Sequence, residues 1–242
     1  MDVPLPLDKL SSVSGSAKGG DGTSAVSLVL VATGSFNPPT YMHMRMFELG
    51  RDALRFEGYN VVAGYMSPVN DAYKKPGLAS GQHRLRLCEL ACENSDFVMA
   101  DPWEVKQNTW QRTITVLQRV QSFLTDGCMS RCPLKIMLLC GSDMIKSFSI
   151  PGVWVPEQVR TICRDFGIVC IQREGLDVEK IISDDDILSQ YRNNIKVVDE
   201  VVPNLISSTR VRDCISRGLS IKYLTSDAIV EYISNNRLYT NQ

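Results

Sequence analysis

His43 and the residues just before it are of types that bind phosphate. Gly34 and Ser35 follow an apolar run at 26–32 that predicts a buried parallel strand, and a helical pattern at 44–49 follows His43. A strand, a tight turn and a helix with a histidine in its first turn form a corner where backbone N–H groups and the positive helix end favour anions. Neither a dinucleotide fingerprint (G-x-G-x-x-G) nor a P-loop (G-x-x-x-x-G-K-[ST]) occurs there. The stretch therefore predicts a nucleotide-phosphate site of another kind.

Arg210 and Arg212 form a second candidate phosphate site, in the segment Ile206-Ser207-Ser208-Thr209-Arg210-Val211-Arg212. A serine here is a natural N-cap and Gly218 a natural stop, so a short helix is expected over about 209–217. Two cations in a first turn oppose the helix dipole by about a few tenths of a kcal/mol, and a bound polyphosphate would reverse that sign. The other interpretation is a solvated basic turn.

Strand and helix patterns alternate from residue 26 onward, which predicts an α/β fold with a doubly wound parallel sheet. Strands are expected at 26–32, 60–66, 97–100, 134–140, 167–171 and 195–201. Helices are expected at 84–92, 114–124 and 157–163, with a small helical portion at the C-terminal side. Ligands of such sheets bind beyond the carboxyl ends of the strands, where both the Gly34 turn and the segment Gly141-Ser142-Asp143 would lie.

Composition points to one soluble globular domain. The 242 residues are 44% hydrophobic and 22% charged, with a net charge of −1. We expect a disordered N-terminal lead-in over 1–24, low in large apolar side chains from residue 14 on, and a single domain over 25–242. The near-neutral charge argues against nucleic-acid and membrane-surface partners. No signal peptide or membrane-spanning run is evident.

The eight cysteines favour a reducing compartment, because several fall in apolar patterns typical of buried thiols. Cys128 and Cys132 are the nearest approach to a metal pair, and without a second pair nearby they do not predict a zinc site.

Five separated blocks together resemble a known family. G-x-F-x-P-x-T-x-x-H at 34–43 resembles the nucleotidylyltransferase signature, and S-x-T-x-x-R at 207–212 is similar to its partner signature. With the blocks at 67–75, 139–143 and 151–154, the chain resembles eukaryotic nicotinamide/nicotinate mononucleotide adenylyltransferases. The resemblance implies a Rossmann-like nucleotidylyltransferase fold. It also implies an enzyme that joins the AMP moiety of ATP to nicotinamide or nicotinate mononucleotide, giving NAD or deamido-NAD and pyrophosphate.

The resemblance also implies roles for particular residues, with His43 and Arg212 as the catalytic pair. ATP would be bound by Gly34, Ser35, Phe36, His43, Ser208, Thr209, Arg210 and Arg212. The mononucleotide or the dinucleotide product would be bound by Gly34, Ser35, Lys75, Trp110, Thr113, Gly141, Asp143, Val153, Trp154, Glu200 and Asn204.

Within that set, Trp110 and Trp154 would stack on the pyridine ring, and Glu200 and Asn204 would lie near the adenosine. Mg²⁺ would enter as Mg-ATP, bound through the phosphates, so no protein metal site is expected. Relatives assemble as homo-oligomers, and a cytoplasmic or nuclear location is expected.

Several alternatives stay open on the sequence alone. Trp110 falls in a helix pattern and could pack in the core, Lys75 could be solvated, and Asp143 could cap a helix. The acceptor could be another phosphate compound, or the chain could be a non-catalytic nucleotide-binding regulator or chaperone. The preference between the two pyridine mononucleotides and the protonation of His43 are also undecided.

Overall fold

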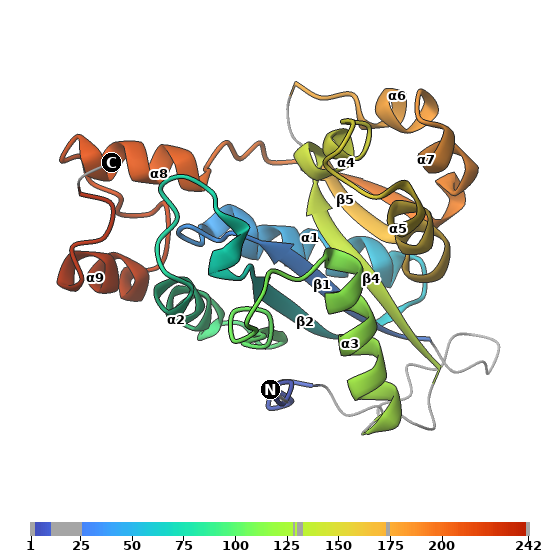
Figure 1. Ribbon diagram of the computed structural model, residues 1–242, viewed down its shortest axis with the longest axis horizontal. Coiled ribbons are helices and arrows are strands. Elements are labelled where there is room, and N and C mark those ends of the chain that lie inside the picture. Colours follow the sequence, from blue (N-terminus) through green and yellow to red (C-terminus); the bar gives the residue numbers. More distant parts are fainter. Residues whose placement is uncertain (1–2, 11–25, 128, 130–132, 173–174, 241–242) are drawn as a thin grey trace.

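The computed structural model describes residues 3–10, 26–127, 129, 133–172 and 175–240. Six strands form one sheet in the order β3-β2-β1-β4-β5-β6, and every neighbouring pair is parallel (Figure 1). The strands are β1 (Ser27–Gly34), β2 (Asn60–Pro68), β3 (Val98–Ala100), β4 (Leu134–Gly141), β5 (Ile168–Gln172) and β6 (Ile195–Asp199). The doubly wound parallel sheet is confirmed. Chain order reverses between β1 and β4, and this switch point is where such sheets bind ligands.

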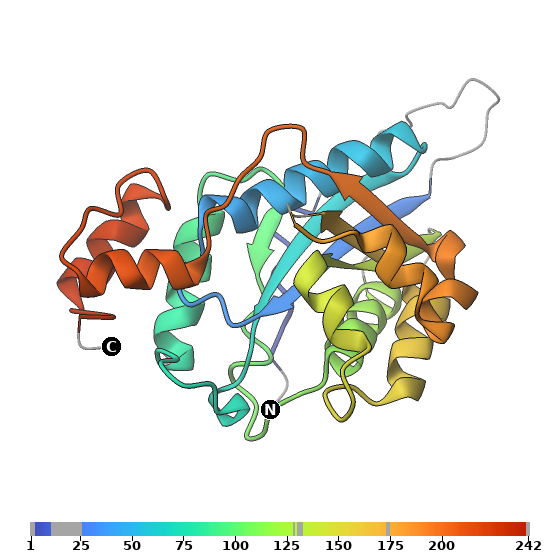
Figure 2. The same cartoon turned by 90° about the horizontal axis from the view of Figure 1, so that it is seen from above.

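Helices cover both faces of the sheet. The helices on these faces are α1 (Tyr41–Phe56), α2 (Gly81–Cys92), α3 (Thr113–Asp126), α4 (Ser142–Phe148), α5 (Pro156–Thr161), α6 (Val178–Ser183) and α7 (Asp186–Gln190). Two more helices, α8 (Ser208–Ser216) and α9 (Asp227–Asn235), lie beyond the sheet. Alternate residues of β1 belong to different cores, because successive side chains of a strand point to opposite faces. Leu28 and Leu30 pack with α1 and α2, whereas Val29 and Val31 pack with α3 to α7. Figure 2 shows helices on the two sides of the sheet.

The expected helical portion on the C-terminal side is formed by α8 and α9, which lie together at one end of the molecule (Figure 1). They share a third apolar cluster with Leu87 and Leu90 of α2, into which Val211 and Ile233 project. This packing fixes the start of α8 relative to the sheet.

The helices expected at 84–92 and 157–163 differ at their ends. The first begins earlier, at Gly81, because the hydroxyl of Ser80 accepts the N–H of His83 and caps it. The second ends at Thr161 and continues as a short π-helical turn, Ile162–Phe166.

Residues 3–10 pack against the domain, although they belong to the lead-in that is expected to be disordered over 1–24. Leu5 is buried in the core, and the hydroxyl of Tyr65 on β2 donates to the carbonyl of Pro6 at 2.8 Å. The apolar side chains of this short segment find a buried place, which is the physical reason for the difference. The rest of the expected lead-in lies outside the described residues.

Candidate functional site

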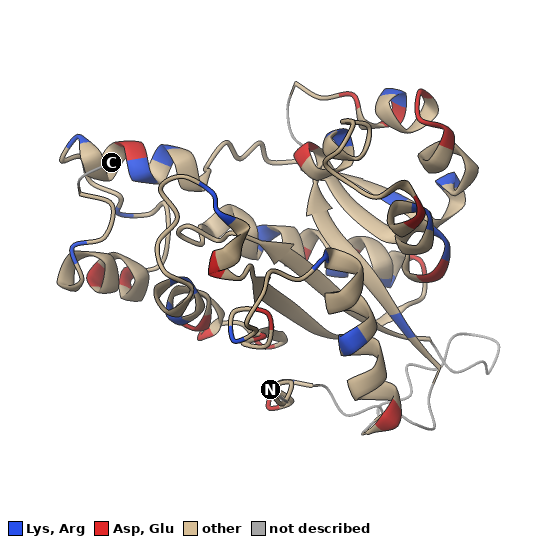
Figure 3. Ribbon diagram, viewed as in Figure 1, with Lys and Arg blue, Asp and Glu red and all other residues tan. Residues whose placement is uncertain are grey.

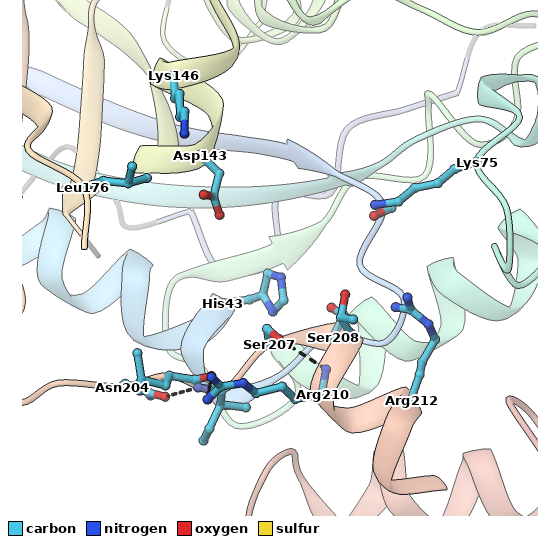
Figure 4. Close-up of a pocket in the computed structure, with 14 residues that line it drawn as sticks. His43, Lys75, Asp143, Lys146, Leu176, Asn204, Ser207, Ser208, Arg210 and Arg212 are labelled. Carbon is cyan, nitrogen blue, oxygen red and sulfur yellow. Dashed lines mark hydrogen bonds between the residues drawn. The ribbon is translucent and has the colours of Figure 1, made fainter. Parts of the chain in front are cut away.

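Two adjoining clefts open at the carboxyl edge of the sheet, beside the end of β1. The first, of about 600 Å³, lies between the β1 turn, α4 and the start of α8, and we call it the phosphate cleft (Figure 4). The second, of about 510 Å³, contains two tryptophans, and we call it the aromatic cleft. Four residues line both clefts and form their boundary: Ser35, His43, Lys75 and Asp143.

His43 lies in the first turn of α1, and the hydrogen bonds of its imidazole fix its tautomer. The backbone N–H of Thr40, which precedes the helix, donates to Nδ1 at 3.0 Å, and the Thr40 hydroxyl lies 2.8 Å from the same nitrogen. A backbone N–H can only donate, so Nδ1 accepts and the ring proton resides on Nε2. His43 therefore presents a fixed hydrogen-bond donor to ligands in the clefts.

The start of α8 docks on the turn that follows β1. The Ser208 hydroxyl donates to the carbonyl of Pro38 at 2.7 Å across 170 residues, and Nη1 of Arg212 donates to the carbonyl of Asn37 at 2.8 Å. The Ser207 hydroxyl caps the helix by accepting the N–H of Arg210 at 3.3 Å. The two phosphate segments expected from the sequence therefore meet in one cleft, and the helix begins one residue earlier than predicted.

Asn37 holds the β1 turn from several sides. Its side-chain amide donates to the carbonyl of Gly77 at 2.8 Å, and its carbonyl oxygen accepts the N–H of Ala79 at 3.0 Å. The same oxygen accepts the hydroxyl of Tyr239 at 2.9 Å. Asn37 is buried and its side chain makes all three of these hydrogen bonds, so it positions the turn.

Arg84 on α2 is a positioning residue that sequence reasoning missed. Its guanidinium is fully buried and donates to the carbonyls of Ser35, Val69 and Ala79, and it pairs with Asp71 at 2.8 Å. These contacts tie the β1 turn to the segment after β2. An arginine in a helix pattern reads as a solvated side chain, so no sequence signal marked it.

Trp154 and Trp110 are the large rings of the aromatic cleft. Nε1 of Trp154 donates to the Ser147 hydroxyl at 2.9 Å, and its ring meets the edge of Phe148 at 4.7 Å between centroids. Trp110 lies in the loop before α3, so the expectation that it belongs to a helix is wrong. Trp110 is 39% exposed, and the centroid of its ring lies 6.0 Å from that of Tyr73, so it is no core residue. The apolar spacing that placed Trp110 in a helix is misleading, because the helix and its buried face begin only at Thr113.

Glu104 is a buried carboxyl at the aromatic cleft that the sequence did not single out. Burial raises the pKa of Glu104 to about 8, because desolvation outweighs the hydrogen bonds from Asn70 and Ser67 that favour its charged form. The Ser67 hydroxyl lies 3.4 Å from Oε2. At neutral pH this carboxyl is mostly protonated, and it is a polar but uncharged part of the cleft wall.

The remaining expected residues divide between the clefts. Thr209, Arg210, Arg212 and Asn204 line the phosphate cleft, together with Lys146, which the sequence did not mark. Gly34, Phe36, Thr113 and Val153 line the aromatic cleft, where the Thr113 hydroxyl lies 3.3 Å from that of Thr33.

Two expected residues do not line either cleft. Gly141 ends β4 and is the N-cap of α4, so Asp143 stands in the first turn of that helix and is not its cap. Glu200 lines a neighbouring depression of about 830 Å³, and Asn204 connects this depression with the phosphate cleft.

No cluster of three or more potential metal ligands occurs among the described residues. Cys128 and Cys132 lie outside them. Within the part of the chain that the structure describes, no helix has both the length and the apolar character of a membrane span.

A parallel sheet with two helix starts and a basic cleft at its switch point defines a nucleotide-binding α/β protein. The family model that matches is named cytidylyltransferase-like, and it covers residues 31–214.

Curated relatives narrow this class. A nicotinamide/nicotinic acid mononucleotide adenylyltransferase of Arabidopsis thaliana is 60% identical over 99% of both chains. Nicotinamide/nicotinic acid mononucleotide adenylyltransferase 1 of Bos taurus is 37% identical over 92% of both. The chain therefore belongs to the cytidylyltransferase-like family and, within it, to the nicotinamide/nicotinic acid mononucleotide adenylyltransferases.

A solved structure supports the fold independently. The nicotinic acid mononucleotide adenylyltransferase of Plasmodium falciparum, complexed with NaAD, superposes with a TM-score of 0.63. The match covers 89% of this chain and 98% of that one at 15% identity.

Proposed function

We propose that this chain joins the AMP moiety of ATP to nicotinamide or nicotinate mononucleotide, releasing pyrophosphate. The observation that carries the proposal is the meeting of two phosphate-binding helix starts beside a cleft with two tryptophans. A triphosphate suits the basic cleft and a pyridine ring suits the aromatic one. The shared boundary at His43 is where the two substrates would meet.

The reaction needs alignment more than proton transfer. An oxygen of the mononucleotide 5′-phosphate attacks the α-phosphorus of ATP. That P–O bond forms as the bond to the bridging oxygen breaks, and pyrophosphate leaves with the electron pair. A phosphate monoester with a second pKa of about 6 is already largely ionised at neutral pH, so no general base is assigned. Catalysis then depends on holding two anions in line and neutralising the charge that develops between them.

His43 and Arg212 are proposed to neutralise that charge. The hydrogen bond at Nδ1 holds the ring of His43 in the orientation from which Nε2–H would donate to a phosphate oxygen. One amino group of Arg212 is held by Asn37, which restrains the guanidinium while leaving other N–H groups for the triphosphate. The first turns of α1 and α8 add their N–H groups.

Mg²⁺ is proposed to accompany ATP, bound to phosphate oxygens and water. When bound, it would offset the negative charge of the phosphates. The residues present fit this arrangement because the phosphate cleft offers basic side chains to the triphosphate and the carboxylate of Asp143 beside them. Lys75 and Lys146 would share the work of charge neutralisation.

The decisive experiment is pyrophosphate release by the purified protein with ATP, Mg²⁺ and each pyridine mononucleotide. Dinucleotide formed in step with pyrophosphate supports the proposal. Release only with phosphopantetheine or phosphocholine would point to another acceptor. ATP binding without release under any condition would favour a non-catalytic regulator or chaperone.

Three further expectations remain proposals. Residues 25–242 would act as one domain, the protein would assemble as a homo-oligomer, and it would work in the cytoplasm or nucleus. Basic and acidic residues are interspersed along the described helices (Figure 3), which supports the expectation that nucleic acid is not a partner. Light scattering of the purified protein tests the oligomeric state.

A further inference from the structure

Arg112 is a charged residue of the aromatic cleft that the proposed reaction has not used. It stands at the N-cap position of α3 and lines the cleft beside Trp110. Its guanidinium carbon lies 5.2 Å from the centroid of the Trp110 ring, so it is held over the indole by a cation–π contact. Within the described part of the chain, no carboxylate forms an ion pair with it.

The charges around the aromatic cleft are unevenly distributed. Its acidic, basic and histidine lining residues are His43, Lys75, Glu104, Arg112 and Asp143. Three of these also line the phosphate cleft and face the phosphate end. Glu104 and Arg112 alone among them are confined to the aromatic end.

The carboxyl of Glu104 does not neutralise the positive charge of Arg112 at neutral pH. Because burial favours the protonated carboxyl, the wall that Glu104 forms is uncharged over most of the physiological range. The aromatic end therefore has a single formal charge among its described residues, and that charge is positive.

The two candidate mononucleotides differ at one substituent of the pyridine ring. The ring itself is a pyridinium cation in both, so a nearby guanidinium repels it. In the nicotinate compound a carboxylate offsets that repulsion and can accept two parallel N–H bonds from an arginine. The carboxamide of the nicotinamide compound is neutral and offers one acceptor, so the repulsion is less well compensated.

We propose that Arg112 makes this site favour the pyridine mononucleotide whose ring carries a carboxylate over the one whose ring carries a carboxamide. This inference rests on the proposed function and names the substrate preference of the same site. Arg112 is a specificity residue here, and the transfer of the AMP moiety does not require it.

The test compares kcat/KM for the two mononucleotides in the wild type and in Arg112→Gln, with ATP and Mg²⁺ saturating. The wild type is expected to favour the acid. In Arg112→Gln the ratio of kcat/KM for the acid to kcat/KM for the amide should fall on the order of tenfold. This is the effect of losing one partly exposed charge-assisted hydrogen bond. Most of the change should appear in KM for the acid, because the contact is made equally in the ground and transition states.

Two further variants separate charge from shape. Arg112→Lys keeps the charge and should retain part of the preference, whereas Arg112→Glu should lower the ratio below that of Arg112→Gln. Arg86→Gln, which removes an exposed arginine of α2 away from both clefts, serves as the matched control and should leave the ratio unchanged. In the wild type, added salt should weaken the preference.

The outcomes distinguish this inference from the proposed function. If the wild type uses neither mononucleotide, the proposed function fails. If it uses both but Arg112→Gln keeps the wild-type ratio within twofold, the specificity role is wrong. Equal losses for both substrates would make Arg112 a structural support of Trp110, and this also overturns the inference.

Discussion

Replacing the buried Arg84 with methionine should remove a large part of the stability of this domain. The guanidinium is 0% exposed, whereas the side chain of its partner Asp71 is 60% exposed and can return to water. The cost therefore falls on the three carbonyls that lose their donor. That of Val69 is buried and should cost about 1–3 kcal/mol, and those of Ser35 and Ala79 are partly buried and should cost about 1 kcal/mol each.

The expected loss in the free energy of unfolding is then about 3–5 kcal/mol, similar to that of breaking other buried ion pairs. Urea unfolding at pH 7, followed by circular dichroism, measures it, with an unchanged m-value required for the comparison. Arg86→Met is the matched control, because Arg86 lies two residues away on α2, is 48% exposed and makes only surface ion pairs. Its loss should stay below about 1 kcal/mol. A loss of less than 1 kcal/mol in Arg84→Met would refute the reasoning that this side chain braces the β1 turn.

Three more variants test the site. His43→Ala should lower kcat by about 100- to 1000-fold, because it removes the Nε2–H donor. The control is His83→Ala on α2, which should leave kcat unchanged because His83 bonds Tyr232 instead. A kcat of His43→Ala within tenfold of wild type would remove His43 from the mechanism. Trp154→Ala should raise KM for the mononucleotide by about 5- to 100-fold, because a stacked ring is lost, and leave KM for ATP nearly unchanged. Equal increases in the two KM values would rule out a stacking role. Because the pKa of Glu104 is raised from 4.5 to about 8, this carboxyl is protonated in the folded protein and ionised in the unfolded chain between these pH values. The stability that the protonated carboxyl contributes is therefore full below about pH 4.5. It declines as the pH rises to about 8, by at most about 1.4 kcal/mol per pH unit. Glu104→Gln should therefore gain stability relative to wild type from pH 5 to 8, and a difference that does not vary with pH would contradict the raised pKa.

The residues that the sequence revealed and those it concealed differ in physical kind. Apolar runs predicted the six described strands within a few residues. The turn at Gly34 and the helix cap at Ser207 were also predicted, because each depends on residues that are neighbours in the sequence. Arg84 and Glu104 were missed because a charged residue is expected in solvent unless its partners are known.

Trp110 shows the limit of periodicity. Its spacing continues the apolar face of α3, yet the backbone before Thr113 is not helical and Trp110 is exposed in a cleft. Whether an aromatic ring packs in a core or lines a ligand site depends on what the rest of the chain places around it. The position of Arg112 beside this ring could not be read from the sequence for the same reason.

The hydroxyl of Tyr239 reaches Asn37 across 202 residues. A ribosome adds about 5–20 residues per second, so about 10–40 s separate the synthesis of these two partners. During that interval β1 to β6 can emerge and pair, while the turn that would cradle the phosphates lacks its final support. On a nascent chain the sheet can therefore form before the turn at the phosphate cleft has its contact with Tyr239.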